Sequence, residues 1–163
     1  MKRMDEASFN QLIKKYGNQV LQICYLYVKN YHTAQDLTQE TFIRVYNKYY
    51  TLRDKTYEKT WIMKIAVNTC KNYLKMIKIV PLSLNDQYQV PSPDHYDVLL
   101  NTNAVTSYVV QLPEKYKEIV MLYYYEEFSI KEISQILKLK ETTVLQRLKR
   151  AREKLRPLLE EVL

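Results

Sequence analysis

The sequence predicts an all-α protein with two small helical domains joined by a flexible linker, and three observations lead to this prediction. Apolar residues recur three and four positions apart along most of the chain, which is the spacing of one helix face. Glycine is almost absent, with Gly17 alone among 163 residues, whereas sandwiches, barrels and phosphate-binding loops need glycine at positive φ. A polar run near the middle interrupts the helical pattern with three prolines: Pro81, Pro91 and Pro93.

The charge distribution supports the same division of the chain. Residues 1–80 carry a net charge of +8, residues 81–111 carry −3, and residues 112–163 carry +2. We therefore expect a first domain over residues 1–80, a linker over 81–97, and a second domain over 98–163. The net charge of +7 and a pI near 9.2 favour a polyanionic partner.

The first domain is expected to contain three amphipathic helices. The apolar stripe of the first helix covers residues 9–27, and Gly17 in its middle is a candidate kink. Thr33 followed by Asp36 resembles a capping box, which predicts the start of the second helix. After a polar interval, Thr60 is the predicted N-cap of the third helix.

The second domain is expected to begin with a helix near residues 97–111, which ends before Pro113. The next helix should have Pro113 in its first turn and direct Tyr123 inward. Ser129 and Glu132 form a further capping box, which predicts a short helix after them.

The end of the chain has the pattern of a helix-turn-helix. The short helix is followed by a tight turn at residues 138–140 and a longer basic helix. Residues 138–156 carry a local charge of +6, which suits phosphate contacts, although a basic face on a packing helix would look the same. Side chains suited to base and phosphate contacts lie opposite its apolar stripe: Thr143, Gln146, Arg147 and Arg150.

The third helix of the first domain has a second basic face. Trp61 stands at its start, and Arg53 belongs to the interval before it. Cations interleaved with aromatic residues suit single-stranded nucleic acid, but an ordinary exposed helix face with Trp61 in the core explains the pattern equally well. The face is formed by Lys64, Asn68, Lys71, Lys75 and Lys78.

The second helix has an acidic outer face in an otherwise basic domain. Ile43 lies among acidic and amide side chains there, which is typical of a protein-docking patch or of a polar face with one stray apolar residue. The face is formed by Asp36, Gln39, Glu40 and Ile43.

The sequence offers little support for catalysis, metal binding or a cofactor. Cys24 and Cys70 form no CxxC motif and are expected to be core thiols, and neither histidine has an evident partner. We therefore expect no enzyme activity, no metal site and no cofactor. The sequence has neither a span apolar enough for a bilayer nor a signal peptide, so we expect a cytoplasmic protein.

Three stretches together resemble the extracytoplasmic-function (ECF) sigma factors of bacterial RNA polymerase. They occur in the family's order over nearly the whole chain, which is more specific than a helix-turn-helix alone. They are DLTQETFIRVY at 36–46, TWIMKIAVN at 60–68, and LPEKYKE at 112–118 with TVLQRLKRAR at 143–152.

The resemblance implies a promoter-specificity subunit that binds core RNA polymerase, reads the −35 and −10 elements and assists promoter melting. In the family, the helix matching residues 36–46 docks on the β′ clamp coiled coil, which implies this role for Asp36, Gln39 and Glu40. The helix matching 60–68 and the loop before it open the −10 element and hold a flipped base, and Asn68 matches the asparagine that contacts it.

The resemblance also implies that the helix-turn-helix reads the −35 element. An anti-sigma factor is a further implied partner, and it could hold the protein at the inner face of the membrane without insertion of this chain. A stand-alone helix-turn-helix regulator remains the alternative function. The residues that match the −35 reader are Thr142, Thr143, Gln146, Arg147 and Arg150.

Several residues depart from the family pattern in the helix-turn-helix. Lys138 and Thr142 stand where the family usually has glycine, and Leu145-Gln146 stands where it usually has Lys-Ser. These departures bear on the −35 sequence preference and not on the fold. Lys140 is a poor N-cap, so the last helix is expected to start at Thr142.

Overall fold

The computed structural model describes residues 4–79 and 104–162, and within them every regular element is a helix. The chain divides into two compact units, Met1–His95 and Tyr96–Leu163. The all-α prediction is confirmed. The expected linker and both expected domain boundaries lie outside the described residues.

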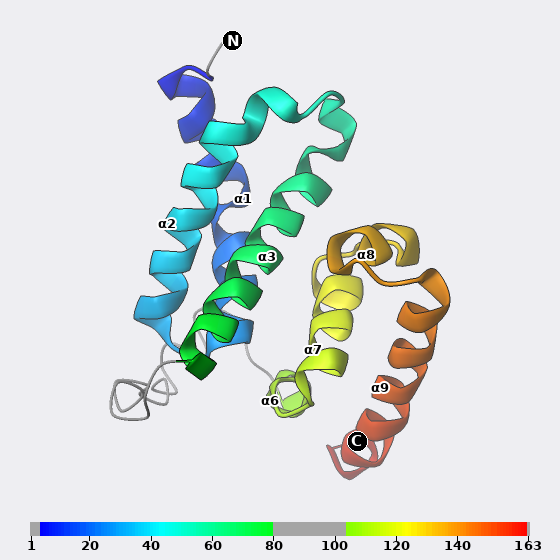
Figure 1. The fold of residues 1–163 in the computed structure, drawn as a ribbon. Helices are drawn as coiled ribbons and strands as arrows, with labels where there is room; N and C mark the ends of the chain where they lie inside the picture. Colours follow the sequence, from blue (N-terminus) through cyan, green and yellow to red (C-terminus); the bar gives the residue numbers. More distant parts are fainter. Residues whose placement is uncertain (1–3, 80–103, 163) are drawn as a thin grey trace. The chain divides into compact units, whose positions relative to one another are not determined.

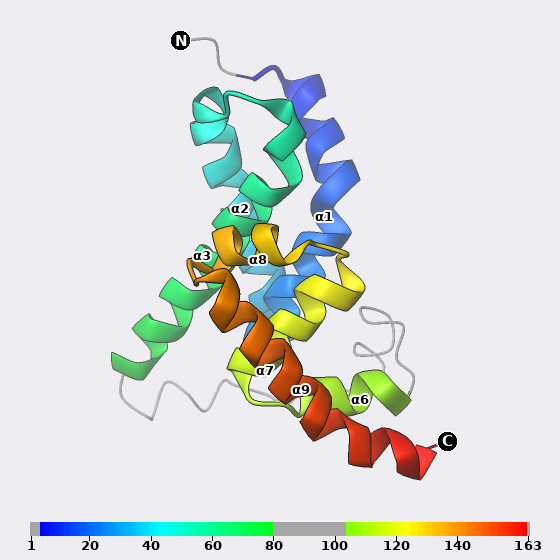
Figure 2. The same cartoon turned by 90° about the vertical axis from the view of Figure 1, so that its right-hand side faces the viewer.

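The first unit is built from α1 (Glu6–Val28), α2 (Tyr31–Lys48) and α3 (Glu58–Ile79), each of which packs on the other two (Figures 1 and 2). Between α2 and α3 the chain makes two 3-10 turns, η1 (Tyr49–Thr51) and η2 (Lys55–Tyr57). Apolar side chains from all three helices form the core, including Val20, Ile23, Val45, Ile62 and Met63.

Two predicted helix starts in the first unit are wrong. The N-cap of α2 is Asn30, whose side chain accepts a hydrogen bond from the Thr33 backbone N–H at 3.0 Å, so Thr33 lies inside the first turn. Lys29 ends α1 in the left-handed conformation, and the two helices therefore follow each other within two residues. Thr60 is likewise inside α3 and is buried, because that helix begins at Glu58.

Helix α1 runs through Gly17 as one continuous α-helix, so the glycine does not interrupt it. A Cβ added at Gly17 would lie 3.8 Å from the Ile13 side chain, which is an ordinary van der Waals contact. Packing therefore does not require a glycine at this position.

The second unit consists of α6 (Ala104–Val110), α7 (Glu114–Val120), η3 (Met121–Tyr125), α8 (Ile130–Leu137) and α9 (Glu141–Val162). Helix α9 packs on α6, α7 and α8 (Figures 1 and 2). Its apolar stripe supplies core residues as the sequence predicts, and these are Val144, Leu148, Ala151 and Leu155.

Three details of the second unit differ from the expectations. η3 is a π-helical turn, and its wider spacing buries Met121 and Leu122 while Tyr123 is only half-buried. Pro113 occupies the N-cap of α7 and not its first turn. Helix α9 begins at Glu141, one residue before the expected start.

No helix in the described part of the chain is long and apolar enough to span a membrane.

Candidate nucleic-acid interface

The basic face of α3 forms as the helical spacing predicts. One α-helix carries all its members, so their relative positions follow from the 3.6-residue repeat. Lys64, Asn68 and Lys71 are half-buried, and Lys75 is exposed. Asn68 is therefore partly exposed, and cations lie on both sides of it along the helix.

The segment between α2 and α3 lies almost entirely on the surface. Among residues 50–57 only Leu52 is half-buried, and the other seven side chains are exposed. Tyr50 and Tyr57 are 58% and 57% exposed, and Arg53 is exposed as well. These aromatic and cationic groups are the types on which unpaired bases stack and phosphates bind.

Backbone and side-chain hydrogen bonds shape this segment locally. The Asp54 carboxylate accepts a hydrogen bond from the Thr56 backbone N–H at 2.9 Å and caps η2. That bond, together with the bond to the Thr56 side chain, holds the pKa of Asp54 below its usual value.

Glu58, the first residue of α3, binds two tyrosine hydroxyls that the sequence analysis did not connect with it. The Tyr16 hydroxyl donates to Oε1 at 3.0 Å, and the Tyr49 hydroxyl donates to Oε2 at 2.6 Å. Burial, reinforced by the hydrogen bond and charge of Glu58, raises the pKa of Tyr49 to about 12. Nothing in the local spacing pairs residues 16 and 58, which come from different helices.

Trp61 is half-buried beside this group. Its ring meets Tyr49 edge to face, with centroids 6.0 Å apart and an interplanar angle of 76°. It therefore packs beneath the segment that precedes α3 and leaves part of its surface accessible.

The outer face of α2 is exposed at every position that the sequence assigns to docking, namely Asp36, Gln39, Glu40 and Ile43. Glu40 forms an ion pair with Arg44 one turn later, with an N–O distance of 2.7 Å. Ile43 is 58% exposed, so an apolar side chain stands among acidic and amide groups.

The helix-turn-helix comprises α8, a turn and α9. The capping box at the start of α8 is complete: the Ser129 hydroxyl accepts from the Glu132 N–H, and the Glu132 carboxylate accepts from the Ser129 N–H, both at 3.1 Å. Lys138 ends α8 in the left-handed conformation, with φ 56° and ψ 46°. The turn is therefore built around the residue that stands where the family usually has glycine.

The predicted −35 residues all lie on α9, but they are not equally accessible. Thr142, Gln146 and Arg150 are exposed, whereas Thr143 and Arg147 are half-buried at the sides of the helix. The sequence analysis gave no role to Leu145, which is 52% exposed within the same stretch.

Arg150 also interacts with Tyr116 of α7. Burial raises the pKa of the Tyr116 hydroxyl, but hydrogen bonding and charge from Arg150 and Lys115 outweigh it, and the pKa lies below the usual value. Lys115 and Lys154 add cation–π contacts to the same ring, at 5.1 and 5.6 Å from its centroid. One of the predicted DNA-reading side chains of α9 therefore lies close enough to α7 to affect the Tyr116 hydroxyl.

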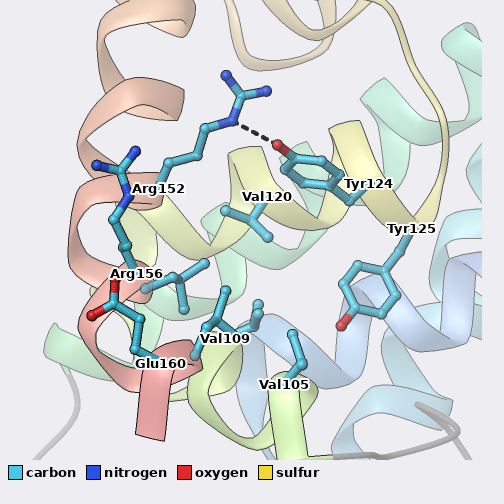
Figure 3. A pocket seen from close by; sticks show the side chains of 10 residues that line it. Val105, Val109, Val120, Tyr124, Tyr125, Arg152, Arg156 and Glu160 are labelled. Atoms are coloured by element: carbon cyan, nitrogen blue, oxygen red, sulfur yellow. Dashed lines mark hydrogen bonds between the residues drawn. The ribbon is translucent and has the colours of Figure 1, made fainter. Parts of the chain in front are cut away.

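The second unit has an apolar groove of about 630 Å³ that the sequence analysis did not predict. Val105 and Val109 of α6, Val120 of α7 and aliphatic residues of α9 line it (Figure 3). At its rim, Arg152 and Tyr124 point toward one another, and the Arg152 Nε donates to the Tyr124 hydroxyl at 2.6 Å (Figure 3).

The described residues bring together no group of three His, Cys, Asp or Glu side chains that could hold a metal ion. Cys24 and Cys70 are both buried free thiols, as expected.

Comparison with known proteins gives a consistent result over both units. Residues 12–78 match the family model for Sigma-70 region 2, and residues 102–155 match that for Sigma-70, region 4. The chain is similar to the ECF RNA polymerase sigma factor SigM of Bacillus subtilis (strain 168), with 31% identity over 93% of this chain and 94% of the relative. It is also similar to the ECF RNA polymerase sigma-E factor of Haemophilus influenzae, with 30% identity over 95% and 91% of the two chains.

Solved structures share the fold. A structure of the sigma factor RpoE in complex with the anti-sigma factor NepR from Bartonella quintana matches with a TM-score of 0.72, 20% identity, and coverage of 94% and 97% of the two chains. A structure of CnrH in complex with the cytosolic domain of CnrY matches with a TM-score of 0.70, 21% identity, and coverage of 96% and 90%.

Proposed function

The chain belongs to the extracytoplasmic-function sigma factors of bacterial RNA polymerase, and we propose that it divides the work of such a factor among three exposed surfaces. It is an alternative sigma factor, which binds core RNA polymerase and directs promoter-specific transcription. Proteins of this kind are DNA-binding initiation factors, and we assign this chain no catalysis of its own and a place of action in the cytoplasm.

The assignment of roles rests on one observation: the polar side chains that match the family lie on one face of each of α2, α3 and α9, where they are exposed on α2 and at least partly exposed on α3 and α9. The α2 face of Asp36, Gln39, Glu40 and Ile43 docks on the β′ clamp coiled coil of the polymerase. Residues 1–80 thus form the domain that docks and opens the −10 element, residues 81–97 form the linker, and residues 98–163 form the −35 domain.

The −10 element meets the face of α3 and the segment before it. An unpaired base needs a partner that offers both a donor and an acceptor, and the Asn68 amide offers both. Lys64, Lys71 and Lys75 hold the backbone of the strand, and Arg53 contacts it from the preceding segment. Trp61 supports this pocket from its packing against Tyr49.

The −35 element meets the exposed face of α9 in the major groove. Arg147 and Arg150 can make bidentate base contacts, Gln146 can read a base edge, and Thr142 and Thr143 can contact a thymine methyl or a phosphate.

Substitution of Asn68 by alanine tests the proposed role in opening. Extrusion of a base costs a few kcal/mol, which contacts made only by the flipped base must offset. The holoenzyme with Asn68→Ala should therefore form the closed complex normally but open the promoter poorly. Closed complexes are measured by gel shift, and opening by permanganate reactivity of thymines in the −10 region.

Asn10→Ala is the matched control, because it makes the same substitution at an exposed position of α1, outside all three surfaces. It should open the promoter as the wild type does. Normal opening by the Asn68→Ala holoenzyme on its own promoter and on −10 variants would contradict base readout by this residue.

The last part of the proposal is that an anti-sigma factor binds this chain. Two solved structures with this fold contain an anti-sigma factor or a cytosolic partner domain. In this chain, the apolar groove of the second unit, bordered by Arg152, Arg156 and Glu160, suits the apolar face of an amphipathic helix on such a partner.

Val105→Asp tests this part of the proposal. The position is exposed, so the added carboxylate should leave the fold intact while it weakens capture of the partner from native cells. Recovery of polymerase with no other stoichiometric protein, before and after stress, would contradict the anti-sigma partner.

A further inference from the structure

The carboxylate of Glu58 links three elements of the first unit. Glu58 begins α3, and it accepts hydrogen bonds from Tyr16 of α1 and from Tyr49, the first residue of η1. Each carboxylate oxygen accepts a hydrogen bond from one hydroxyl, so the two bonds do not compete for the same oxygen. Hydrogen bonds to a charged group are stronger than those between neutral groups, and at 2.6 Å the bond from Tyr49 is short.

The segment enclosed by the Tyr49–Glu58 bond has little packing of its own. Residues 50–57 contribute no buried side chain, and neither η1 nor η2 contains a buried residue. A segment with so few apolar contacts is expected to be locally weak unless other interactions fix it. The Tyr49–Glu58 bond closes it into a loop, and the bond from Tyr16 ties that closure to α1.

The loop carries the groups that an opened strand would contact. Tyr50 and Tyr57 are more than half exposed, and Arg53 lies exposed between them in the sequence. If this loop were ordered only when the strand binds, the lost conformational entropy would oppose promoter opening. A loop that is closed in advance presents the same groups at a smaller entropic cost.

We propose that Glu58 is a positioning residue for promoter opening, which holds the loop of residues 49–57 against α1 and α3 in the conformation that receives the unpaired −10 strand. The inference rests on the proposed function of this loop and of Asn68. Glu58 itself contacts no base; it acts through Tyr49, and Tyr16 anchors it.

The test compares holoenzymes that contain Glu58→Ala or Glu58→Gln. Glu58→Ala removes both bonds and should slow opening about tenfold while closed-complex affinity stays within about twofold of the wild type. Glu58→Gln should retain most of the opening activity, because its amide can accept from one hydroxyl and donate to the other. Opening is measured by the rate of permanganate reactivity in the −10 region.

Two tyrosine variants distinguish the effects of the two hydrogen bonds on promoter opening. Tyr49→Phe removes the bond that closes the loop and should slow opening nearly as much as Glu58→Ala. Tyr49→Phe together with Glu58→Ala should be little worse than Glu58→Ala alone, because both changes remove the same bond. Tyr16→Phe removes only the anchor to α1 and should have a smaller effect.

Glu6→Ala is the matched control. Glu6 is the first residue of α1, as Glu58 is of α3, and it is exposed. Glu6→Ala therefore removes an acidic group at the same helical position and loses the same interaction with the helix dipole. Glu6 is, however, distant in sequence from the loop of residues 49–57. It should leave opening unchanged.

Three results would overturn the inference: normal opening by Glu58→Ala, equal impairment by Glu58→Ala and Glu58→Gln, or a loss of closed complex as large as the loss of opening. The last would indicate a general structural role, and thermal unfolding of each variant provides an independent measure of it. Failure of the proposed function has a different signature, namely normal opening by the Asn68→Ala holoenzyme.

Discussion

At the scale of single residues, α1 and α8 each end on a lysine whose backbone is in the left-handed region. Lys29 has φ 55° and Lys138 has φ 56°, and the backbone N–H of each bonds to the carbonyl four residues earlier. Helices often end in this conformation, but glycine is the residue that adopts it without steric conflict between Cβ and the carbonyl oxygen. Both helix ends are therefore less stable than the same geometry with glycine.

Lys138→Gly should stabilise the second unit. The substitution relieves the conflict at φ 56° and should raise the free energy of unfolding by about 1 kcal/mol. Thermal or urea unfolding followed by circular dichroism measures the change. Lys140→Gly is the control, because Lys140 has no positive φ and its replacement should not stabilise the protein. A lower stability of Lys138→Gly would mean that the lysine side chain compensates for the strained backbone.

Leu145 should read a thymine methyl in the −35 element. It is 52% exposed on α9, and apolar contact is the means by which proteins recognise the 5-methyl group of thymine in the major groove. Replacement of the contacted thymine by deoxyuridine removes one methyl and should weaken the closed complex by about 1 kcal/mol.

Leu145→Ala provides the control for this prediction, because it should lower the affinity for the thymine promoter and abolish the difference between thymine and deoxyuridine. Closed-complex affinity of the holoenzyme is measured for each −35 thymine in turn. If deoxyuridine weakens binding of the wild type and of Leu145→Ala equally at every −35 position, Leu145 does not contact a thymine methyl.

At the scale of elements, the π-helical turn after α7 shapes the second unit. The hydrogen bond from the Glu126 N–H to the Met121 carbonyl spans five residues in place of four, which widens the turn, and Met121 and Leu122 are buried in the core. Tyr124 and Tyr125 then line the apolar groove, where Tyr124 accepts a hydrogen bond from Arg152 of α9. One irregular turn therefore determines both the core packing and the surface of the groove.

Helix α2 should dock on polymerase through its acidic face. Glu40→Lys reverses a charge on that face and should weaken binding of core polymerase at least tenfold at low salt. The substitution also breaks the ion pair with Arg44, but an exposed pair between neighbouring turns contributes only about 0.3–0.5 kcal/mol to stability, so the fold should persist.

Binding of labelled sigma factor to core polymerase measures the effect of Glu40→Lys, and circular dichroism verifies the fold. Glu6→Lys makes the same charge change at an exposed position of α1 and should bind core polymerase normally. Equal affinity of the Glu40→Lys variant and the wild type would remove this face from the docking site.

At the scale of the whole molecule, the chain has a net charge of +7 and carries its proposed DNA contacts on two separate units. The sequence between them contains Pro81, Pro91 and Pro93 and has no helical pattern, so we expect the chain alone not to fix the separation of the two contacts. Core polymerase is then needed to hold them at the spacing of a promoter.

The free chain should therefore bind promoter DNA weakly, with a strong dependence on salt and little preference for sequence. Addition of core polymerase should produce tight and promoter-selective binding. Fluorescence anisotropy at several salt concentrations, on a promoter and on a scrambled duplex, measures both states. Tight and specific binding by the free chain as a dimer would instead favour a stand-alone helix-turn-helix regulator.

The sequence by itself determined the helices of both units and the faces that they expose. The relevant signals are local: the apolar stripe of α9, the capping box of Ser129 and Glu132, and the polar positions along α3 all depend on residues three or four apart. Spacing of this kind does not depend on how the helices pack, which is why the exposure of Gln146 and the partial exposure of Asn68 could be predicted.

Only the tertiary structure decided which distant side chains meet. Tyr16 and Glu58 are 42 residues apart, and their bond depends on the way α1 packs against α3. The bond from Tyr49 to Glu58 closes a loop whose two 3-10 turns leave no periodic signal. Such contacts form where helices cross, and a one-dimensional pattern of polar and apolar residues does not specify that crossing.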